Sequence, residues 1–310
     1  MSRQEITLKA KDGYELALRI YEADEPRAVV KIIHGMQEHQ ERYLPFAEYL
    51  QAAGYTAVTA DLRGHGRNAP MLSHIADSDG HLRLLEDEET ILDMIHERWA
   101  GVPVILFAHS MGTIIARVFL QKESREFHKV VLSGYPNPNP AAGAGILLSG
   151  LLSSFKGANG YSKMVDGMVL GPFSKAVPNA KTPVDWLSVN PENVEKYRED
   201  PLCGARFTLG SYSALFNLIK QMGNAGKYEE VWKELPILLI SGREDPCTGG
   251  EKGRAASETV LRKAGFRELE IVTLDGMRHE ILNETGKEAV YKKILDFIES
   301  SGTNEKERQI

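Results

Sequence analysis

Short apolar runs and longer amphipathic stretches alternate along most of this chain. Runs rich in β-branched residues, apolar almost throughout, occur at residues 28–33, 55–60, 102–107, 130–132 and 237–240. Such runs are typical of strands that are buried on both faces of a sheet. Apolar residues at helical spacing predict helices at residues 43–53, 84–99, 111–121, 251–264 and 287–298. Strands and helices therefore alternate, which predicts parallel β-α-β units.

This alternation predicts an α/β fold with a mostly parallel, doubly wound sheet and helices on both of its faces. Residues 5–9 and 15–21 alternate in polarity and are joined through Lys11, Asp12 and Gly13, so we expect an antiparallel hairpin at one edge. Ligands of such sheets bind at the carboxyl ends of the strands. The loops that follow strands are therefore where we look for chemistry.

The alternation breaks after Tyr135. Prolines at positions 136, 138 and 140 end the preceding strand, and glycine-rich apolar helices without strand-like runs follow. We expect residues 1–135 and 207–310 to form one core, and residues 136–206 to form an inserted helical cap. The apolar side chains of this cap either pack on the core, which is the commoner role of such a stripe, or face lipid. They are Ile146, Leu147, Leu148, Leu151, Leu152, Phe155, Met164, Met168, Val169 and Leu170.

Composition and charge narrow the choice of compartment and partner. Hydrophobic residues make up 42% and charged residues 26%, as in a globular protein with a sizeable core. The net charge of -6, without a Lys/Arg run to offset it, argues against nucleic acid as a partner. The first ten residues lack the apolar region of a secretory signal, and two cysteines are too few for a disulfide scaffold. We therefore expect a cytoplasmic protein with free thiols.

Ser110 is the candidate nucleophile. It lies in Ala108-His109-Ser110-Met111-Gly112, between a predicted strand and a predicted helix. A serine on so sharp a turn stands clear of the sheet at a helix N-terminus, where backbone N–H groups favour negative charge. The ordinary alternative is a helix N-cap serine. Ala108 also replaces the first glycine of the usual G-x-S-x-G pattern and adds a methyl group where the chain turns.

Asp245 and His279 are the candidate acid and base, because a serine nucleophile needs a base and a base needs an orienting acid. Asp245 follows the fifth buried run, with Glu244 as the second choice, and His279 follows a further alternating run at residues 268–274. A helix cap and a solvated loop histidine are the ordinary alternatives. Only Ser110, Asp245 and His279 each follow a core strand in the order Ser, Asp, His that this kind of fold uses.

Two backbone N–H groups are candidates for an oxyanion hole. One belongs to Met111, directly after the nucleophile, and the other to Met36 in the loop after the first buried run. Each such donor is often worth about 3 kcal/mol in the transition state. Gly35 would let the backbone approach a substrate closely, although an ordinary glycine turn is the alternative.

Several motifs resemble those of the monoacylglycerol lipase and lysophospholipase family of α/β-hydrolases. Residues 34–39 (HGMQEH), with Arg42 and Tyr43, look like its H-G-x-x-E-H-x-x-R-Y segment. Residues 61–66 resemble its D-x-x-G-H-G loop, and residues 108–112 its G-H-S-M-G elbow except at Ala108. Residues 200–203 (DPLC) resemble the segment that leads out of its cap.

The resemblance implies an α/β-hydrolase fold with Ser110, Asp245 and His279 as the triad and Met36 and Met111 as the oxyanion donors. It also implies a cap that shapes an acyl-binding pocket. The expected activity is hydrolysis of single-chain acyl esters, such as monoacylglycerols or lysophospholipids, through an acyl-serine intermediate. Candidate substrate contacts are Gly35, Leu148, Leu152 and Met168.

Two other functions remain open from the sequence. A capped serine aminopeptidase would hold the substrate amino group with cap carboxylates, and a binding protein would keep the pocket without turnover. The carboxylates available for the first are Asp166, Asp185, Glu192 and Glu195. No H-E-x-x-H motif occurs, and His34 and His39 lack zinc-pair spacing, so we expect no metal and no cofactor. The expected partners are a small acyl ester and, through the cap, a membrane or micelle surface; nothing fixes the number of subunits.

Overall fold

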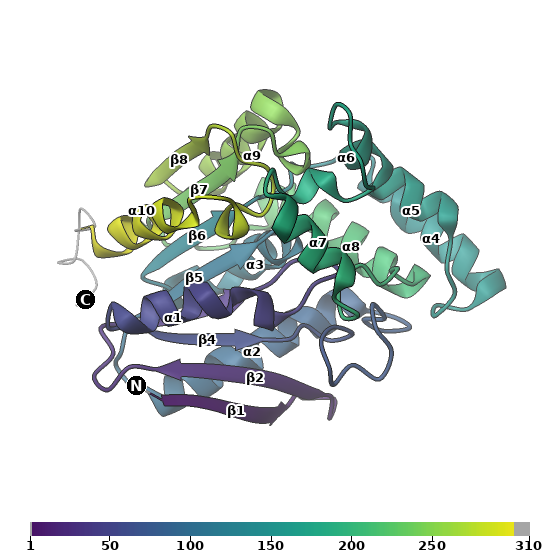
Figure 1. Ribbon diagram of the computed structural model, residues 1–310. Helices are drawn as coiled ribbons and strands as arrows, with labels where there is room; N and C mark the ends of the chain where they lie inside the picture. The colour runs from purple at the N-terminus through teal and green to yellow at the C-terminus, as the bar shows by residue number, and fades with distance from the viewer. Residues whose placement is uncertain (1, 301–310) are drawn as a thin grey trace.

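Eight strands form one sheet in the computed structural model, which describes residues 2–300 (Figure 1). The order across the sheet is β1-β2-β4-β3-β5-β6-β7-β8, and every neighbouring pair from β4 to β8 is parallel. This confirms the predicted α/β class. The strands are β1 (Ser2–Lys9), β2 (Glu15–Glu22), β3 (Val29–Ile33), β4 (Thr56–Ala60), β5 (Val104–His109), β6 (Lys129–Ser133), β7 (Ile237–Gly242) and β8 (Leu269–Leu274).

The predicted edge hairpin is confirmed. β1 and β2 pair antiparallel, with Lys9 opposite Glu15 next to the turn, and β2 also pairs antiparallel with β4. Alternate residues of β2, among them Leu18 and Ile20, are buried in the core. The polarity pattern of the hairpin therefore reflects one packed face and one more exposed face.

Helices cover both faces of the sheet. On one face lie α2 (Gly80–Arg98), α3 (Met111–Glu123), α8 (Leu209–Met222) and α9 (Gly250–Ala264). On the other face lie α1 (Leu44–Ala52) and α10 (Lys287–Glu299). Successive residues of β5 point to opposite faces, with Leu106 in the first core and Phe107 in the second. The strands are apolar almost throughout because both faces are buried.

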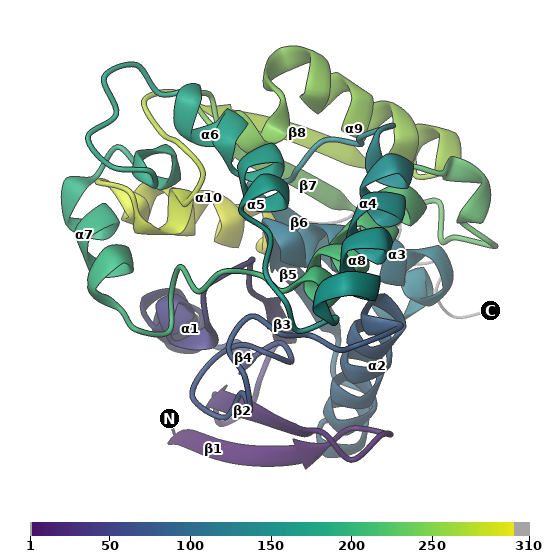
Figure 2. The same cartoon turned by 90° about the vertical axis from the view of Figure 1, so that its right-hand side faces the viewer.

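Between β6 and α8, the segment 136–206 contains helices and no strand. Its helices are α4 (Ala142–Lys156), α5 (Lys163–Val169), α6 (Gly171–Lys175) and α7 (Pro191–Glu199). They stand at the right of the molecule in Figure 1, away from both marked chain ends, and Figure 2 turns them toward the viewer. Directly after this segment, α8 packs against α2 and α3 as well as against α4.

The apolar stripe of α4 is divided between two environments. Leu148 and Leu152 pack against the core that includes α8. Leu147, Leu151 and Phe155 are 76%, 60% and 82% exposed. One side of the helix therefore packs on the core, and the other side is exposed to solvent. Among residues 2–300, no helix is both long enough and apolar enough to cross a bilayer.

Candidate active site

Ser110 lies at a strained turn between β5 and α3. Its backbone has φ 52° and ψ -121°, a conformation that non-glycine residues rarely adopt and that costs about 1–3 kcal/mol. The Ser110 N–H donates to the carbonyl of Ser133 at 3.0 Å, which fixes the turn against β6. Ala108 is fully buried within β5, so its methyl group is accommodated without preventing the turn. Strain of this kind persists where the surrounding structure enforces it, and it exposes the hydroxyl.

Ser110, His279 and Asp245 form one chain of hydrogen bonds. His279 Nε2 lies 2.8 Å from Ser110 Oγ, and His279 Nδ1 lies 2.9 Å from Asp245 Oδ2. The other Asp245 oxygen accepts the backbone N–H of Cys247 at 2.8 Å, which orients the carboxylate. Asp245 and His279 are both buried. The folded chain therefore brings the three predicted residues together in the geometry of a nucleophile, a base and an orienting acid.

The electrostatics of the site distinguish the candidate base, His279, from the adjacent imidazole of His109. Burial alone would lower the pKa of His279, but the charge and hydrogen bond of Asp245 outweigh it and raise this pKa well above its usual value. Burial and the neighbouring His279 lower the pKa of His109 to about 3. The two ring centroids are 4.7 Å apart. His109 therefore stays neutral beneath the turn, and His279 is the ring that takes up a proton.

Gly134 belongs to the site although the sequence analysis did not select it. Its φ is 56°, and a Cβ atom there would lie 3.0 Å from His279 Nδ1 and 2.9 Å from His109 Cε1. Any side chain would push the histidine away from Asp245. The available signal was a single glycine two positions after the run at residues 130–132, where a loop at the carboxyl end of a strand begins.

The loop after β3 packs directly against Ser110. A Cβ atom on Gly35 would lie 2.9 Å from Ser110 Cβ, so only glycine allows this approach. The Gly35 N–H donates to Glu38 Oε1 at 2.6 Å, and Met36 lines the small void beside Ser110. Met111 is the first residue of α3, where a helix leaves its N–H groups without intrahelical partners. The two expected oxyanion donors thus belong to backbone that borders Ser110 on either side.

Arg42 connects three parts of the site. Its Nε donates to Glu38 Oε2 at 3.2 Å, on the loop after β3, and its Nη2 donates to Glu280, next to His279. Asn193 of α7 donates to the same Glu280 oxygen at 2.6 Å and accepts from Arg42 at 3.3 Å. The sequence motif at residues 34–43 contains Glu38 and Arg42, but no local pattern links Glu280 or Asn193 to it. These two residues therefore could not be selected from the sequence.

The two carboxylates beside Arg42 titrate differently. Burial would raise the pKa of Glu38, but the nearby His109, Arg42 and Tyr43 lower it to about 2. Tyr43 donates its hydroxyl to Glu38 Oε1 at 2.8 Å. Burial raises the pKa of Glu280 even though Arg42 lies beside it. Glu38 is therefore the ionised partner that holds the Gly35 N–H.

A tryptophan from the segment 136–206 covers the site. The ring of Trp186 lies 5.0 Å from that of His279, centroid to centroid, at an interplanar angle of 44°. Trp186, Leu187 and Tyr197 line the void at Ser110, whose volume is about 20 Å³. Binding sites for small organic ligands usually measure about 300–1,000 Å³. The site is therefore closed in this structure.

Arg278 and Glu284 hold this cover in place, and we call their hydrogen bonds the clasp. The Glu284 carboxylate accepts the Ser188 hydroxyl at 2.7 Å and the N–H groups of Val189 and Arg278 at 3.0 and 2.9 Å. The Arg278 guanidinium donates to the carbonyls of Asp185 and Ser188 at 2.8 and 3.2 Å. Because Arg278 and Glu284 flank His279 in the chain, the clasp ties the cover to the loop that carries the base.

Only one of the four predicted substrate contacts borders the closed void. Gly35 does so. Leu148 and Leu152 pack against the core instead, because α4 turns this side toward α8, and Met168 is largely exposed. The residues that do cover Ser110 from this segment are Trp186, Leu187 and Tyr197, which no sequence pattern had selected.

The carboxylates considered for an aminopeptidase lie elsewhere. Asp166 pairs with Arg206 and accepts the Tyr212 hydroxyl. Asp185 accepts the backbone N–H of Lys181 at 2.6 Å, and Glu195 pairs with Arg198 on the surface. Glu192 lines a separate surface groove. None of these four borders the void at Ser110.

Two groups of described side chains have donor atoms close enough to hold a metal ion. One is Asp245, Cys247 and His279, which is the Ser110 site itself, and burial raises the pKa of Cys247 to about 11. The other, away from Ser110, is His39, Asp200 and Cys203. Both cysteines are free, as the sequence predicted.

Comparison with known proteins agrees with this fold. The family profile described as serine aminopeptidase, S33, matches residues 24–286. The chain is similar to a monoacylglycerol lipase of Mycolicibacterium smegmatis, with 26% identity over 96% of this chain and 98% of the relative. It is also similar to phospholipase YtpA of Bacillus subtilis, with 25% identity over 89% and 97%. A thermostable carboxyl esterase from Bacillus coagulans superposes with a TM-score of 0.86 at 24% identity, over 96% of this chain and 98% of the esterase.

Proposed function

The chain belongs to the serine aminopeptidase S33 family of α/β-hydrolases, and from this premise we propose that it cleaves carboxylic esters of single acyl chains, of the monoacylglycerol or lysophospholipid type. The observation that carries the proposal is the hydrogen-bonded chain from Ser110 through His279 to Asp245 at a strained turn. Similarity to proteins named monoacylglycerol lipase and phospholipase supports esters of lipids as the substrate class. The family assignment shows that the chain is a serine hydrolase. Its substrate class and the roles of its site residues are what we propose.

The proposed reaction begins with Ser110. As Oγ attacks the ester carbonyl, His279 Nε2 takes its proton and Asp245 stabilises the imidazolium that forms. The N–H groups of Met36 and Met111 donate to the tetrahedral oxyanion. When this intermediate collapses, His279 gives the proton to the departing alcohol and an acyl-Ser110 ester remains. Water activated by His279 then attacks this ester and releases the fatty acid.

We propose that the segment 136–206 is a cap that must move before such a substrate reaches Ser110. The void of about 20 Å³ holds no acyl chain, and Trp186 lies over the base. Opening requires breaking the clasp between the cap and the loop that carries His279. Ser188 and Glu284 are buried in the closed form, so opening exchanges their hydrogen bonds for contacts with water, at about 0.5–1.5 kcal/mol net for each bond and more where a charge takes part.

The outer side of the cap supports contact with a lipid or micelle surface. Leu147, Leu151 and Phe155 recur at every fourth position of α4 and are exposed together with Met164 and Met168 of α5. Exposed apolar patches of this kind are uncommon on monomeric proteins unless something binds them. Lys156 ends α4 and Lys163 begins α5, and both are exposed where they would face anionic headgroups. A substrate held in a micelle would meet the cap first.

Nothing at Ser110 favours the aminopeptidase alternative. The carboxylates that do border the void are Glu38 and Glu280, and both are already paired with Arg42. They are therefore not available to a substrate ammonium group. Hydrolysis of aminoacyl arylamides remains the comparison that separates the two activities.

The test compares the parent chain with Ser110→Ala on nitrophenyl esters from acetyl to palmitoyl, on monoacylglycerol and lysophospholipid micelles, and on aminoacyl arylamides. Ser154→Ala, on the exposed side of α4, is the matched control. We expect the parent and the control to hydrolyse long-chain esters and Ser110→Ala to hydrolyse none. A fluorophosphonate should label the parent and the control but not Ser110→Ala. Arylamide cleavage, or a wide preference for acetyl, would refute the proposal. A well-folded parent chain that hydrolyses no ester and is not labelled at Ser110 would point to a binding protein.

A further inference from the structure

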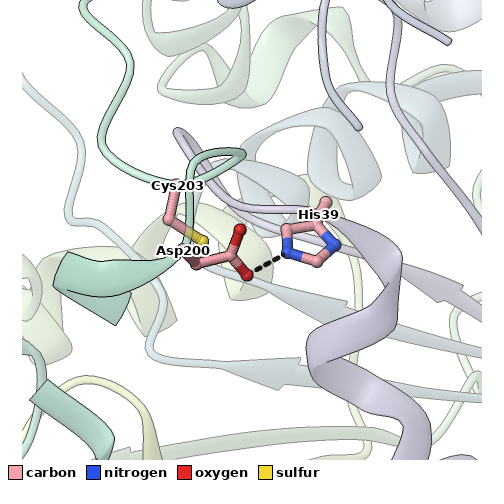
Figure 3. A group of neighbouring side chains, drawn as sticks. All are labelled: His39, Asp200 and Cys203. Carbon is pink, nitrogen blue, oxygen red and sulfur yellow. Dashed lines mark hydrogen bonds and ion pairs between the residues drawn. The ribbon is translucent and has the colours of Figure 1, made fainter. Parts of the chain in front are cut away.

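His39, Asp200 and Cys203 bring a nitrogen, an oxygen and a sulfur donor together outside the Ser110 site (Figure 3). Their donor atoms all lie within 4.8 Å of one another, and His39 Nε2 lies 2.8 Å from Asp200 Oδ2. His39 belongs to the loop after β3, whereas Asp200 and Cys203 belong to the exit of the cap. The group therefore forms only in the folded chain.

Asp200 and Cys203 are presented by one tight turn. The Leu202 N–H donates to Asp200 Oδ1 at 2.9 Å, and the Cys203 N–H donates to the Asp200 carbonyl at 3.0 Å. This leaves Asp200 Oδ2 directed at His39, as Figure 3 shows. Two donors three positions apart on a turn repeat the spacing that C-x-x-C turns use to hold zinc. The turn thus arranges two ligands in advance, and His39 supplies a third from another part of the chain.

The group is partly enclosed but reachable from solvent. The His39 side chain is 4% exposed and that of Asp200 27%. Both residues line a surface groove of about 750 Å³, which also receives Lys196 and Glu192 from α7. A bound ion would have a route of entry from this groove and water available for a further coordination position.

Charge around the group is negative despite Arg42. This guanidinium lies near Cys203, but it is already paired with Glu38 and Glu280. Burial raises the pKa of Glu280, and even with that group protonated, Glu38 and Asp200 outnumber Arg42. Burial raises the pKa of the Cys203 thiol, so its thiolate would form only when an ion binds. A divalent cation would therefore relieve repulsion among buried and half-buried anions rather than create it.

We propose that His39, Asp200 and Cys203 form a site for one zinc ion, or a similar soft divalent cation, with groove water in the fourth position. Nitrogen, carboxylate oxygen and thiolate sulfur are the ligands that zinc takes in proteins. His39 Nε2 and Asp200 Oδ2 need to part by only about half an ångström to stand at tetrahedral distance around zinc. On binding, the Cys203 thiol loses its proton to solvent and the Nε2 proton of His39 moves to Nδ1, so one proton is released per ion.

An ion at this position would join the cap to the loop beside Ser110. The cap exit already touches that loop, because Gly204 N–H and the Tyr197 hydroxyl donate to the Gln37 carbonyl at 2.9 and 3.0 Å. Gln37 directly follows Met36. Ligation by His39 would strengthen this contact and oppose cap movement, so we expect zinc to slow hydrolysis of long-chain esters. This expected effect rests on the proposed function, whereas binding of the ion does not.

Binding is tested on the reduced full-length chain with Zn²⁺ by calorimetry and with Co²⁺ by absorption. We expect one ion per chain, release of one proton, and a thiolate-to-cobalt charge-transfer band. Cys203→Ser should abolish the band and weaken binding at least tenfold, and His39→Gln should weaken binding without loss of folding in thermal unfolding scans. Cys247→Ser, which removes the thiol of the group at Asp245, should keep both the band and the affinity.

Three results would overturn the proposal. They are absence of binding by the parent chain, equal binding by Cys203→Ser, and loss of the band in Cys247→Ser instead. The second would assign the ion to surface carboxylates and the third to the Ser110 site. Because none of these readouts needs turnover, an inactive enzyme would contradict the proposed function and leave the metal site testable.

Discussion

Replacing Arg42 by methionine tests whether the network of Glu38, Arg42 and Glu280 supports the site. Methionine keeps most of the length of the side chain and removes the guanidinium. Two buried carboxylates then lose their cation, while the Asn193 contact to Glu280 remains. Breaking a buried ion pair by removing one partner typically costs about 3–5 kcal/mol.

The pKa of Glu38 gives a second route to the same magnitude. Its lowering from 4.5 to about 2, to which His109 and Tyr43 contribute as well as Arg42, corresponds to linked stability of about 3 kcal/mol, which is an upper limit for the share of Arg42. Because the folded-state pKa is the lower one, this stability is present above pH 4.5 and is lost as the pH falls toward 2. Arg42→Met should therefore reduce the free energy of unfolding by up to about 3 kcal/mol at neutral pH, and this difference from the parent should shrink as the pH falls, because the parent loses the linked stability there and the variant no longer has it.

Activity should fall along with stability. Glu38 holds the Gly35 N–H, and Gly35 packs on Ser110, so a loosened loop would misplace the proposed oxyanion donor, the Met36 N–H. Loss of one oxyanion donor costs about 10²–10³-fold in kcat, which sets the upper limit. We expect a fall of about tenfold to a hundredfold in kcat on a soluble short-chain ester, with a smaller change in KM.

The assay combines urea unfolding between pH 4 and 8 with initial rates on the same samples. Arg67→Met is the matched control, because Arg67 is exposed and pairs with Glu41 at 3.2 Å on the surface. Such a pair is worth about 0–1 kcal/mol, so the control should behave like the parent. An Arg42→Met protein within about 1 kcal/mol of the parent and with unchanged kcat would refute the role given to this network.

Three further outcomes follow from the site. Asp245→Asn removes the charge that raises the pKa of His279. The rising limb of the pH profile of kcat/KM should therefore move to lower pH, and the rate should fall on the order of 10⁴-fold. A rising limb at the same pH as in the parent would contradict the role given to Asp245. Glu284→Gln weakens the clasp, the hydrogen bonds that hold the cover containing Trp186. The KM for long-chain esters should fall, and amide hydrogen exchange at residues 186–190 should become faster. Slower exchange would mean that the clasp does not hold the cover. Phe155→Ser removes an exposed aromatic ring from α4. In a sedimentation assay, binding to phosphatidylcholine vesicles should weaken about tenfold, and hydrolysis of a soluble ester should not change. Equal sedimentation of the variant and the parent with vesicles would exclude this side of the cap as the contact.

The sequence by itself was sufficient for the sheet and for the positions of the reacting groups. Strands buried on both faces must be apolar throughout, so their runs identify them without any long-range information. Once a parallel sheet is inferred, the carboxyl ends of its strands meet at one edge. Ser110, Asp245 and His279 could therefore be selected because each follows a strand, and the folded chain brings them within hydrogen-bonding distance.

Only the tertiary structure decided what surrounds those groups. Which side of α4 faces α8 depends on contacts between distant segments, so Leu148 and Leu152 could not be assigned to the core or to a pocket in advance. Trp186 reaches His279, and Glu280 reaches Arg42, through packing across large separations in the chain. An apolar run or a strand end is a local property of the sequence, but the enclosure of a site is a sum of long-range contacts, and no local pattern encodes it.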